Sequence, residues 1–115
     1  MKFTLYTATC RENAKNIKYP KDVEVIDEES LKSAVQFDHV SAKFTDDKRS
    51  NASFIESDCL MFDCDNSHSE NPEDWVTPLE LALTFSDVAF AVAYSRNHMK
   101  NKGNRIARLG FQIII

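Results

Sequence analysis

The chain has 115 residues, of which 43% are hydrophobic and 28% are charged, with a net charge of -4. These values are typical of one globular domain with a core, and the acidic balance argues against a general nucleic-acid coat. The chain has no apolar run near the roughly 18 residues that cross a bilayer, and the start of the chain has no signal-peptide cleavage pattern, so we expect a cytoplasmic protein without a membrane partner.

The first half of the chain predicts strands around one helix. Residues 2–9 alternate between apolar and polar side chains, and residues 23–26 and 39–44 are further strand candidates. Residues 11–19 are polar and predict a helical turn that Pro20 ends. Asp27 is the expected N-cap of a helix that carries Glu28 and Glu29 in its first turn and extends to about Val35. Residues 45–52 predict a turn.

The second half contains the strongest strand signal, Ser57–Cys64, because its apolar run is continuous, as in a strand covered on both faces. A polar loop follows, residues 66–75. Thr77 and Pro78 then predict the N-cap and first position of a helix to about Thr84. Residues 88–94 predict a second buried strand, and residues 109–115 predict a final one after a polar, basic segment.

The order strand, helix, strand over residues 57–94 indicates one βαβ unit. We therefore expect an α/β (α+β) fold, with residues 1–115 forming a single domain whose mixed sheet is flanked by helices. Ile113, Ile114 and Ile115 would form an uncovered hydrophobic strand at the end of the chain. Such a strand suggests a truncated domain or a homodimer that pairs through it.

Cys10, Cys59 and Cys64 form no CxxC pair, so the simplest expectation is free thiols with a structural role. Cys59, Cys64 and His68 are conceivable zinc ligands. Their spacing matches no common zinc site, and a fourth ligand is not obvious.

Asp63 and Asp65 follow the apolar run of the strongest strand. Alternate side chains of a strand share a face, so the two carboxylates should point the same way, about 7 Å apart. Such a pair is suited to Mg²⁺ or Mn²⁺, and two such ions would hold a nucleotide and an attacking hydroxyl in line. The alternative is that these acids cap the following turn, which Asn66 and Ser67 would close.

The charge distribution supports a cation site beside a polyanion. Residues 51–95 contain nine acids and no Lys or Arg, whereas residues 96–115 contain five Lys or Arg and no acid. The candidate phosphate-binding side chains after the 88–94 strand are Arg96, His98, Lys100, Lys102, Arg105 and Arg108. Their natural partners are a triphosphate or a nucleic-acid backbone, and the alternative is a solvated loop. Trp75 is more simply an anchor for the polar loop than a platform for a base.

Residues 54–66, 71–75 and 94–98 together resemble the archaeo-eukaryotic-type primase-polymerase domains of phages, plasmids and other mobile elements, over roughly residues 35–115. The resemblance implies that Asp63 and Asp65 are the catalytic, metal-binding pair of the first motif. It also implies nucleotide or phosphate contacts from Ser95, Arg96, His98, Lys102, Arg108 and Gln112. Gln112 stands where the family has a nucleotide-contacting histidine, and the aspartate of the third motif has no counterpart. We therefore expect metal and nucleotide binding without a complete polymerase site.

Two other function classes stay open. In a haloacid-dehalogenase-type phosphatase, Asp63 would be the nucleophile and Asp65 the acid/base, with Tyr94 and Ser95 imitating the second motif. The remaining alternative is a non-enzymatic interaction module.

Overall fold

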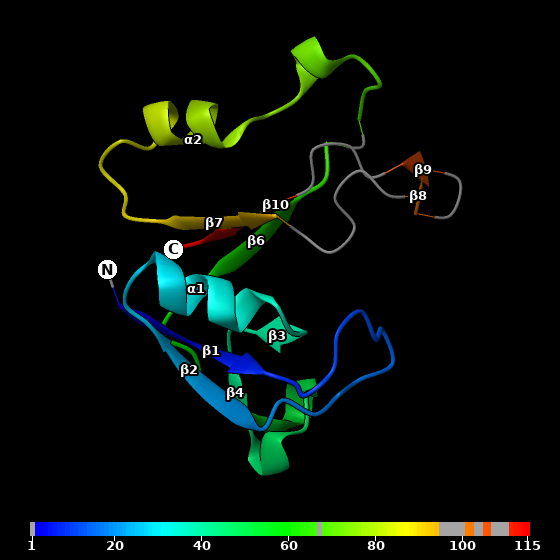
Figure 1. The fold of residues 1–115 in the computed structure, drawn as a ribbon, viewed down its shortest axis with the longest axis vertical. Helices are drawn as coiled ribbons and strands as arrows, with labels where there is room; N and C mark the ends of the chain where they lie inside the picture. The colour runs from blue at the N-terminus through cyan, green and yellow to red at the C-terminus, as the bar shows by residue number, and fades with distance from the viewer. Residues whose placement is uncertain (1, 67, 95–100, 103–104, 107–110) are drawn as a thin grey trace. The chain divides into compact units, whose positions relative to one another are not determined.

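The computed structural model describes residues 2–66, 68–94, 101–102, 105–106 and 111–115 (Figure 1). The chain divides into two compact units, residues 1–60 and residues 61–115, which are treated separately below. Helices and antiparallel strand pairs make up the described secondary structure, which confirms the α+β class. The expectation of a mixed sheet is wrong for the described strands, because every ladder among them is antiparallel. The assignment of residues 1–115 to one domain stays a prediction.

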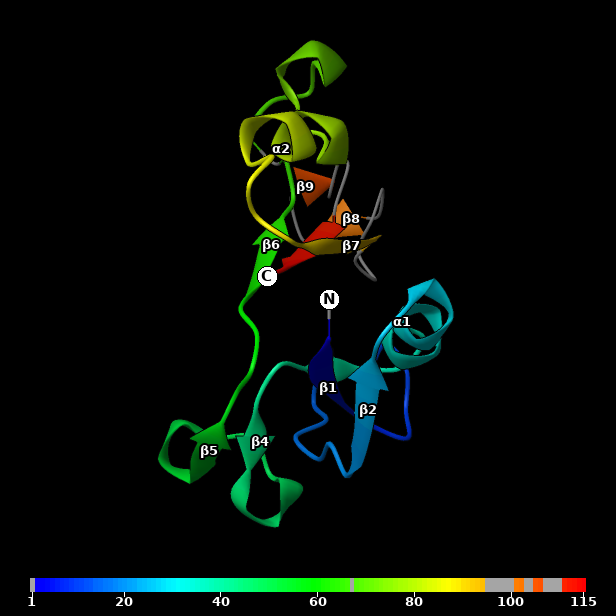
Figure 2. The same ribbon diagram turned by 90° about the vertical axis from the view of Figure 1, so that its left-hand side faces the viewer.

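Unit 1 is built around strand β1, Phe3–Thr7, which lies between β2, Lys21–Val25, and β3, His39–Val40. Helix α1, Glu28–Val35, packs against β1 and β2, as Figures 1 and 2 show. The segment of residues 11–19 contains turns rather than the predicted helical turn. Apart from that segment, the predicted elements of residues 2–35 are confirmed to within a few residues.

The start of α1 shows why its N-terminus was predictable. The Asp27 carboxylate accepts the Ser30 backbone N–H at 2.8 Å, and the Ser30 hydroxyl accepts the Asp27 N–H at 3.1 Å. This reciprocal capping satisfies N–H groups that have no partner inside the helix. The Ser30 backbone N–H, and after it the Ser30 hydroxyl, which donates to the same carboxylate at 2.8 Å, lower the pKa of Asp27.

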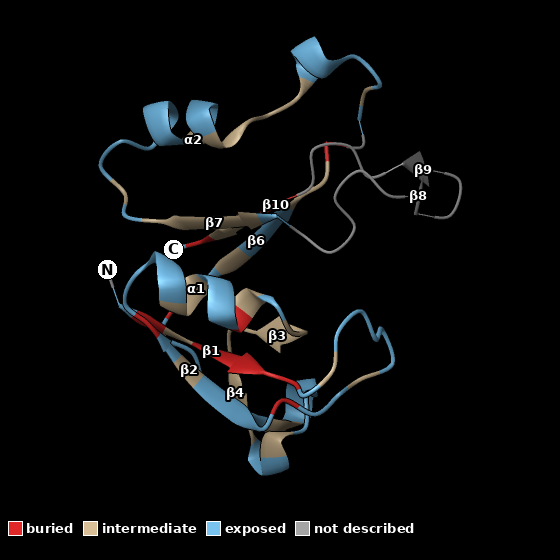
Figure 3. Cartoon of the chain, in the orientation of Figure 1, coloured by how far each residue is buried: buried red, intermediate tan, exposed pale blue. Residues whose placement is uncertain are grey.

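The core of unit 1 includes residues on both faces of β1, a strand that Figure 3 colours as mostly buried. Phe3, Leu5 and Thr7 are buried on one face, and Tyr6 on the other forms a cluster with Ala8 and Tyr19. Side chains on both faces of β1 are therefore removed from water, and each fully buried large apolar side chain contributes about 1.5–3 kcal/mol.

The segment predicted as one strand over residues 39–44 is two strands in different sheets. β3 ends at Val40, and β4, Lys43–Phe44, pairs instead with β5, Phe54–Glu56. Thr45–Asp47 forms the short 3₁₀ turn η1, and Asn51–Ser53 forms η2. The predicted turn over residues 45–52 is therefore confirmed.

The turn after β4 has an unusual backbone. Asp46 and Asp47 have φ values of 57° and 58°, and the Lys48 N–H donates to the Thr45 carbonyl at 3.2 Å. Positive φ at both central residues defines a type I′ turn, which most residues with a Cβ adopt at a cost of about 1–2 kcal/mol per residue. Aspartate tolerates this region better than most side chains, which accounts for its presence here.

The predicted strand Ser57–Cys64 is wrong in its first half, since residues 57–60 lie outside any strand. The Asp58 carboxylate accepts the Thr4 N–H at 2.9 and 3.1 Å, and the Ser57 hydroxyl donates to the Ser41 carbonyl at 2.5 Å. Short polar side chains compete in this way with ladder hydrogen bonds. Only Met61–Cys64 forms a strand, β6.

Unit 2 contains a three-stranded sheet in the order β6-β10-β7, with β7 at Ala91–Tyr94 and β10 at Phe111–Ile114. β10 is antiparallel to both neighbours, so β6 and β7 run in the same direction. With helix α2, Pro78–Thr84, between them in sequence, they form a βαβ unit split by the inserted β10. β8, Asn101–Lys102, and β9, Arg105–Ile106, form a separate small ladder.

The position of β10 corrects two expectations. Among the described strands, β6 borders only β10 and is therefore at the edge of its sheet. Phe62 is 50% exposed, so β6 is not covered on both faces. Ile113 and Ile114 are in the central strand and paired on both sides, which removes the unpaired edge that suggested a dimer. A homodimer stays a prediction.

Helix α2 begins as predicted, with the Thr77 hydroxyl accepting the Glu80 N–H at 3.2 Å and Pro78 in the first turn. Its leucines Leu79 and Leu83 are exposed. Within the described residues, neither α1 nor α2 has the length and apolar character that a membrane span requires.

Cys59 is buried, and burial, followed by the nearby Asp58 charge, raises its pKa from 9.0 to about 11. The folded state therefore favours the thiol, so the stabilisation that it contributes is fully present below pH 9 and is lost as the pH rises through about 11. We expect the free energy of unfolding to fall over this range, as measured by urea titrations at several pH values. Cys59→Ala should flatten that fall, and an unchanged pH dependence would contradict the assignment.

Candidate functional site

The candidate site is one cross-strand row on the unit 2 sheet. Asp63 of β6 lies opposite Gln112 of β10, and Gln112 lies opposite Ala93 of β7. Directly opposed residues share a face and have Cβ atoms about 4.5–5.5 Å apart. Asp63 and Gln112, which the sequence predicts to share one site, are 49 positions apart in the chain, and the sheet register makes them neighbours.

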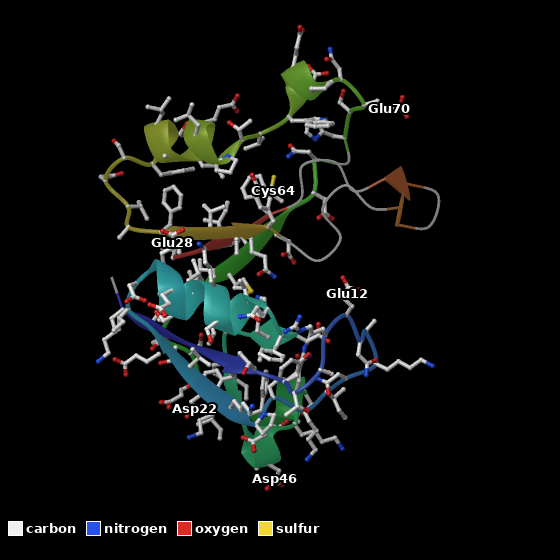
Figure 4. All side chains as sticks on the ribbon, in the orientation of Figure 1. Glu12, Asp22, Glu28, Asp46, Cys64 and Glu70 are labelled. Atoms are coloured by element: carbon white, nitrogen blue, oxygen red, sulfur yellow. The ribbon has the colours of Figure 1, made fainter. Side chains whose placement is uncertain are left out.

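The two carboxylates occupy different positions at the end of β6. Asp63 is in the strand and exposed, whereas Asp65 is half-buried and follows the last strand residue. That last residue, Cys64, is labelled in Figure 4. Asn66 follows with a φ of 52°, which turns the chain away from the strand direction. The predicted DxD pair is therefore located at the strand end, immediately before the positive-φ residue Asn66.

Because Asp63 is exposed, water solvates its charge, and the cost of burying an unpaired carboxylate does not apply to it. A cation is therefore not needed to make the pair tolerable. The pair is still suited to a divalent cation. The carboxylate oxygens of Asp63 and Asp65 and the amide oxygen of Gln112 are hard ligands of the kind that Mg²⁺ and Mn²⁺ prefer.

Asn66 is the residue that sequence reasoning undervalued. Its side chain is 4% exposed, donates to the Val76 carbonyl at 2.9 Å and accepts the Val76 N–H at 2.7 Å. This two-point contact closes the loop of residues 66–76 next to Asp65. The available signal was the Asp-Asn sequence at a strand end, because asparagine favours turns and tolerates positive φ.

The loop that Asn66 closes has its own hydrogen bonds. The Trp75 indole N–H donates to the Ser69 carbonyl at 3.0 Å, the Ser69 hydroxyl to Asp74 at 2.8 Å, and His68 Nε2 lies 2.8 Å from the Asp74 carbonyl. The 3₁₀ turn η3, Pro72–Asp74, is capped by Asn71. Trp75 is thus a loop anchor, and His68 is engaged by the backbone.

Cys64, on the face of β6 opposite Asp63, has its pKa raised, chiefly by burial. The cysteines are free thiols. Among the described residues there is no group of three or more His, Cys, Asp or Glu side chains that would hold a metal ion. A cation at Asp63 and Asp65 would therefore depend on ligands beyond these side chains, such as water or phosphate oxygens.

The ends of β6 and β7 and the start of β10 lie at the same end of the unit 2 sheet. Cys64 at the end of β6 and Tyr94 at the end of β7 both lie opposite Phe111 at the start of β10. Ser95, Arg96, His98 and Arg108 lie outside the described residues, as does the side chain of Lys102, whose backbone is in β8.

No protein-family model matches the chain, and neither the curated proteins nor the solved structures contain a significant match.

Proposed function

We propose that the chain is a primase-polymerase-like nucleotidyltransferase module in which Asp63 and Asp65 hold Mg²⁺ or Mn²⁺ against the phosphates of a nucleoside triphosphate. The observation that supports the proposal is the direct opposition of Asp63 and Gln112 on neighbouring strands. A carboxylate for the cation and an amide N–H for a phosphate oxygen would then act on one ligand.

The bound cation would neutralise phosphate charge and draw the carboxylates and the nucleotide together. Gln112 can donate a hydrogen bond but has neither a titratable proton nor a positive charge. We therefore infer binding of metal and nucleotide without efficient nucleotidyl transfer. Ser95, Arg96, His98, Lys102 and Arg108 are the proposed further phosphate contacts, and a nucleic acid is the proposed second substrate.

The test compares three proteins by thermal shift and isothermal titration with Mn²⁺ and a deoxynucleoside triphosphate. The natural chain should be stabilised by the two ligands together, by about 2.7 kcal/mol at 100 times the dissociation constant. Asp63→Asn should lose this stabilisation. The matched control is Asp87→Asn, which removes the same charge from another exposed position of unit 2.

Equal responses of both variants would contradict the proposal. Phosphate release from a small phosphoester that Asp63→Asn abolishes would favour the phosphatase alternative instead. That alternative draws no support from the sheet order, because β10 separates β6 from β7 by two strand spacings, about 9–10 Å. An absence of any metal-dependent stabilisation would favour the interaction module.

A further inference from the structure

Unit 1 contains a pair of lysines in an unusual arrangement. Lys18 and Lys48 form an isolated antiparallel bridge between the segment before Tyr19 and the turn after β4. The flanking bonds are Tyr19 N–H to the Asp47 carbonyl at 3.0 Å and Arg49 N–H to the Ile17 carbonyl at 2.8 Å. These bonds make the lysines a non-hydrogen-bonded pair, the type with Cα atoms about 4.5 Å apart and the closest side chains.

Like charges directly opposite each other destabilise a strand pair. The Lys18 ammonium donates to the Asp46 backbone carbonyl at 3.1 Å, which is a neutral acceptor and adds no opposite charge. Within the described part of the chain, the ion pairs are Lys2 with Glu24 and Lys32 with Glu28, and they include neither bridge lysine.

Lys18 and Lys48 are both exposed and lie directly opposite each other, and this pair is here called the basic patch. Asp46, labelled in Figure 4, and Asp47 are in the adjoining turn, and their negative charges offset part of this positive charge. That turn keeps two successive non-glycine residues at positive φ, and it holds Lys48 against Lys18. The fold therefore keeps two unfavourable features at one place, the positive φ of Asp46 and Asp47 and the repulsion between Lys18 and Lys48. Strained backbone of this kind is commonly found at functional sites.

Polar groups border the basic patch. The Asn16 side chain bonds the backbone of Lys18 at 2.9 and 3.3 Å, and the Ser53 hydroxyl donates to the Lys48 carbonyl at 2.8 Å. These contacts fix the backbone that carries the cations. Protein surfaces that contact phosphate and sugar commonly combine lysine with asparagine and serine in this way. The apolar residue next to Lys18, Ile17, is 43% exposed. One half-exposed side chain offers little apolar surface for insertion into a lipid layer, so a membrane is a poorer candidate partner.

We propose that the basic patch binds the phosphodiester backbone of a nucleic acid. This site goes beyond the function proposed above, because it lies in unit 1 and requires no divalent cation. It would hold a strand electrostatically and without sequence preference.

The test is fluorescence anisotropy of a labelled 20-nucleotide single-stranded DNA with the full chain, in EDTA so that the proposed metal site does not contribute. Lys18→Ala with Lys48→Ala should weaken binding about tenfold at low salt. It should also make the salt slope of log K shallower by about 1.4, which corresponds to two phosphate contacts at 0.7 each. The matched control is Lys2→Ala with Lys32→Ala, which removes the same net charge from the two ion-paired lysines.

The bridge variant should have an unchanged or higher melting temperature, because it loses a repulsion, and this separates loss of binding from loss of fold. Equal weakening by the two double variants would overturn the proposal, since only net charge would then matter. Unaltered binding by the bridge variant would overturn it too, as would tighter, bridge-dependent binding to phosphatidylserine vesicles than to DNA.

Discussion

Replacing Leu5 with alanine is expected to destabilise unit 1 by about 2–5 kcal/mol, the usual cost of truncating a fully buried leucine. Leu5 has no exposed surface and is at the centre of β1, the middle strand of its sheet. Its removal would leave a cavity where neighbouring side chains are held by strand pairs on both sides. For a unit of about 60 residues, whose total stability is of order 3–9 kcal/mol, this loss approaches unfolding.

Urea titration followed by far-ultraviolet circular dichroism measures this effect. The matched control is Leu60→Ala, in the same unit, where the leucine is 62% exposed. That change should alter the free energy of unfolding by no more than about 0.5 kcal/mol. Similar losses in the two variants would mean that Leu5 is not the centre of the core.

The sequence was informative wherever structure is determined locally. Asp27 and the Thr77-Pro78 pair predicted the helix starts because an N-cap bonds residues only three positions away. The alternation of residues 2–9 likewise predicted β1, because neighbouring side chains of a strand point to opposite faces and this pattern can be read from adjacent residues alone.

Strand partners depend on distant residues, and here prediction from sequence was weaker. The apolar run before Asp63 did not reveal that β6 is an edge strand, because a run of this kind does not specify its neighbours. Nor did it show that Asp58 would bond Thr4, 54 positions away, in place of continuing the strand. The insertion of β10 between β6 and β7 was equally invisible, although it is what brings Gln112 beside Asp63.

Replacing Asn66 with alanine is expected to destabilise unit 2 by about 2–4 kcal/mol. The change removes two hydrogen bonds and leaves the half-buried Val76 N–H and carbonyl without their side-chain partner, which costs up to about 1–3 kcal/mol for each group. The loop of residues 66–76 would then lose its closure at the end of β6. Trp75, the single tryptophan of the chain, lies in that loop and would report its release as a change in fluorescence.

Asn66→Asp separates the two halves of this contact. A carboxylate still accepts the Val76 N–H but has no N–H for the Val76 carbonyl and faces it with like partial charge, so its cost should equal or exceed that of alanine. Asn71→Ala is the control within the same loop, because Asn71 is exposed and caps only the short turn η3. If Asn66→Ala leaves stability and Trp75 emission unchanged while Asn71→Ala alters both, the loop is held by its internal bonds and not by Asn66. If Asn66 holds the loop, Asn66→Ala should also weaken the Mn²⁺ binding proposed for Asp63 and Asp65 although both carboxylates are intact, because Asp65 is directly followed by residue 66.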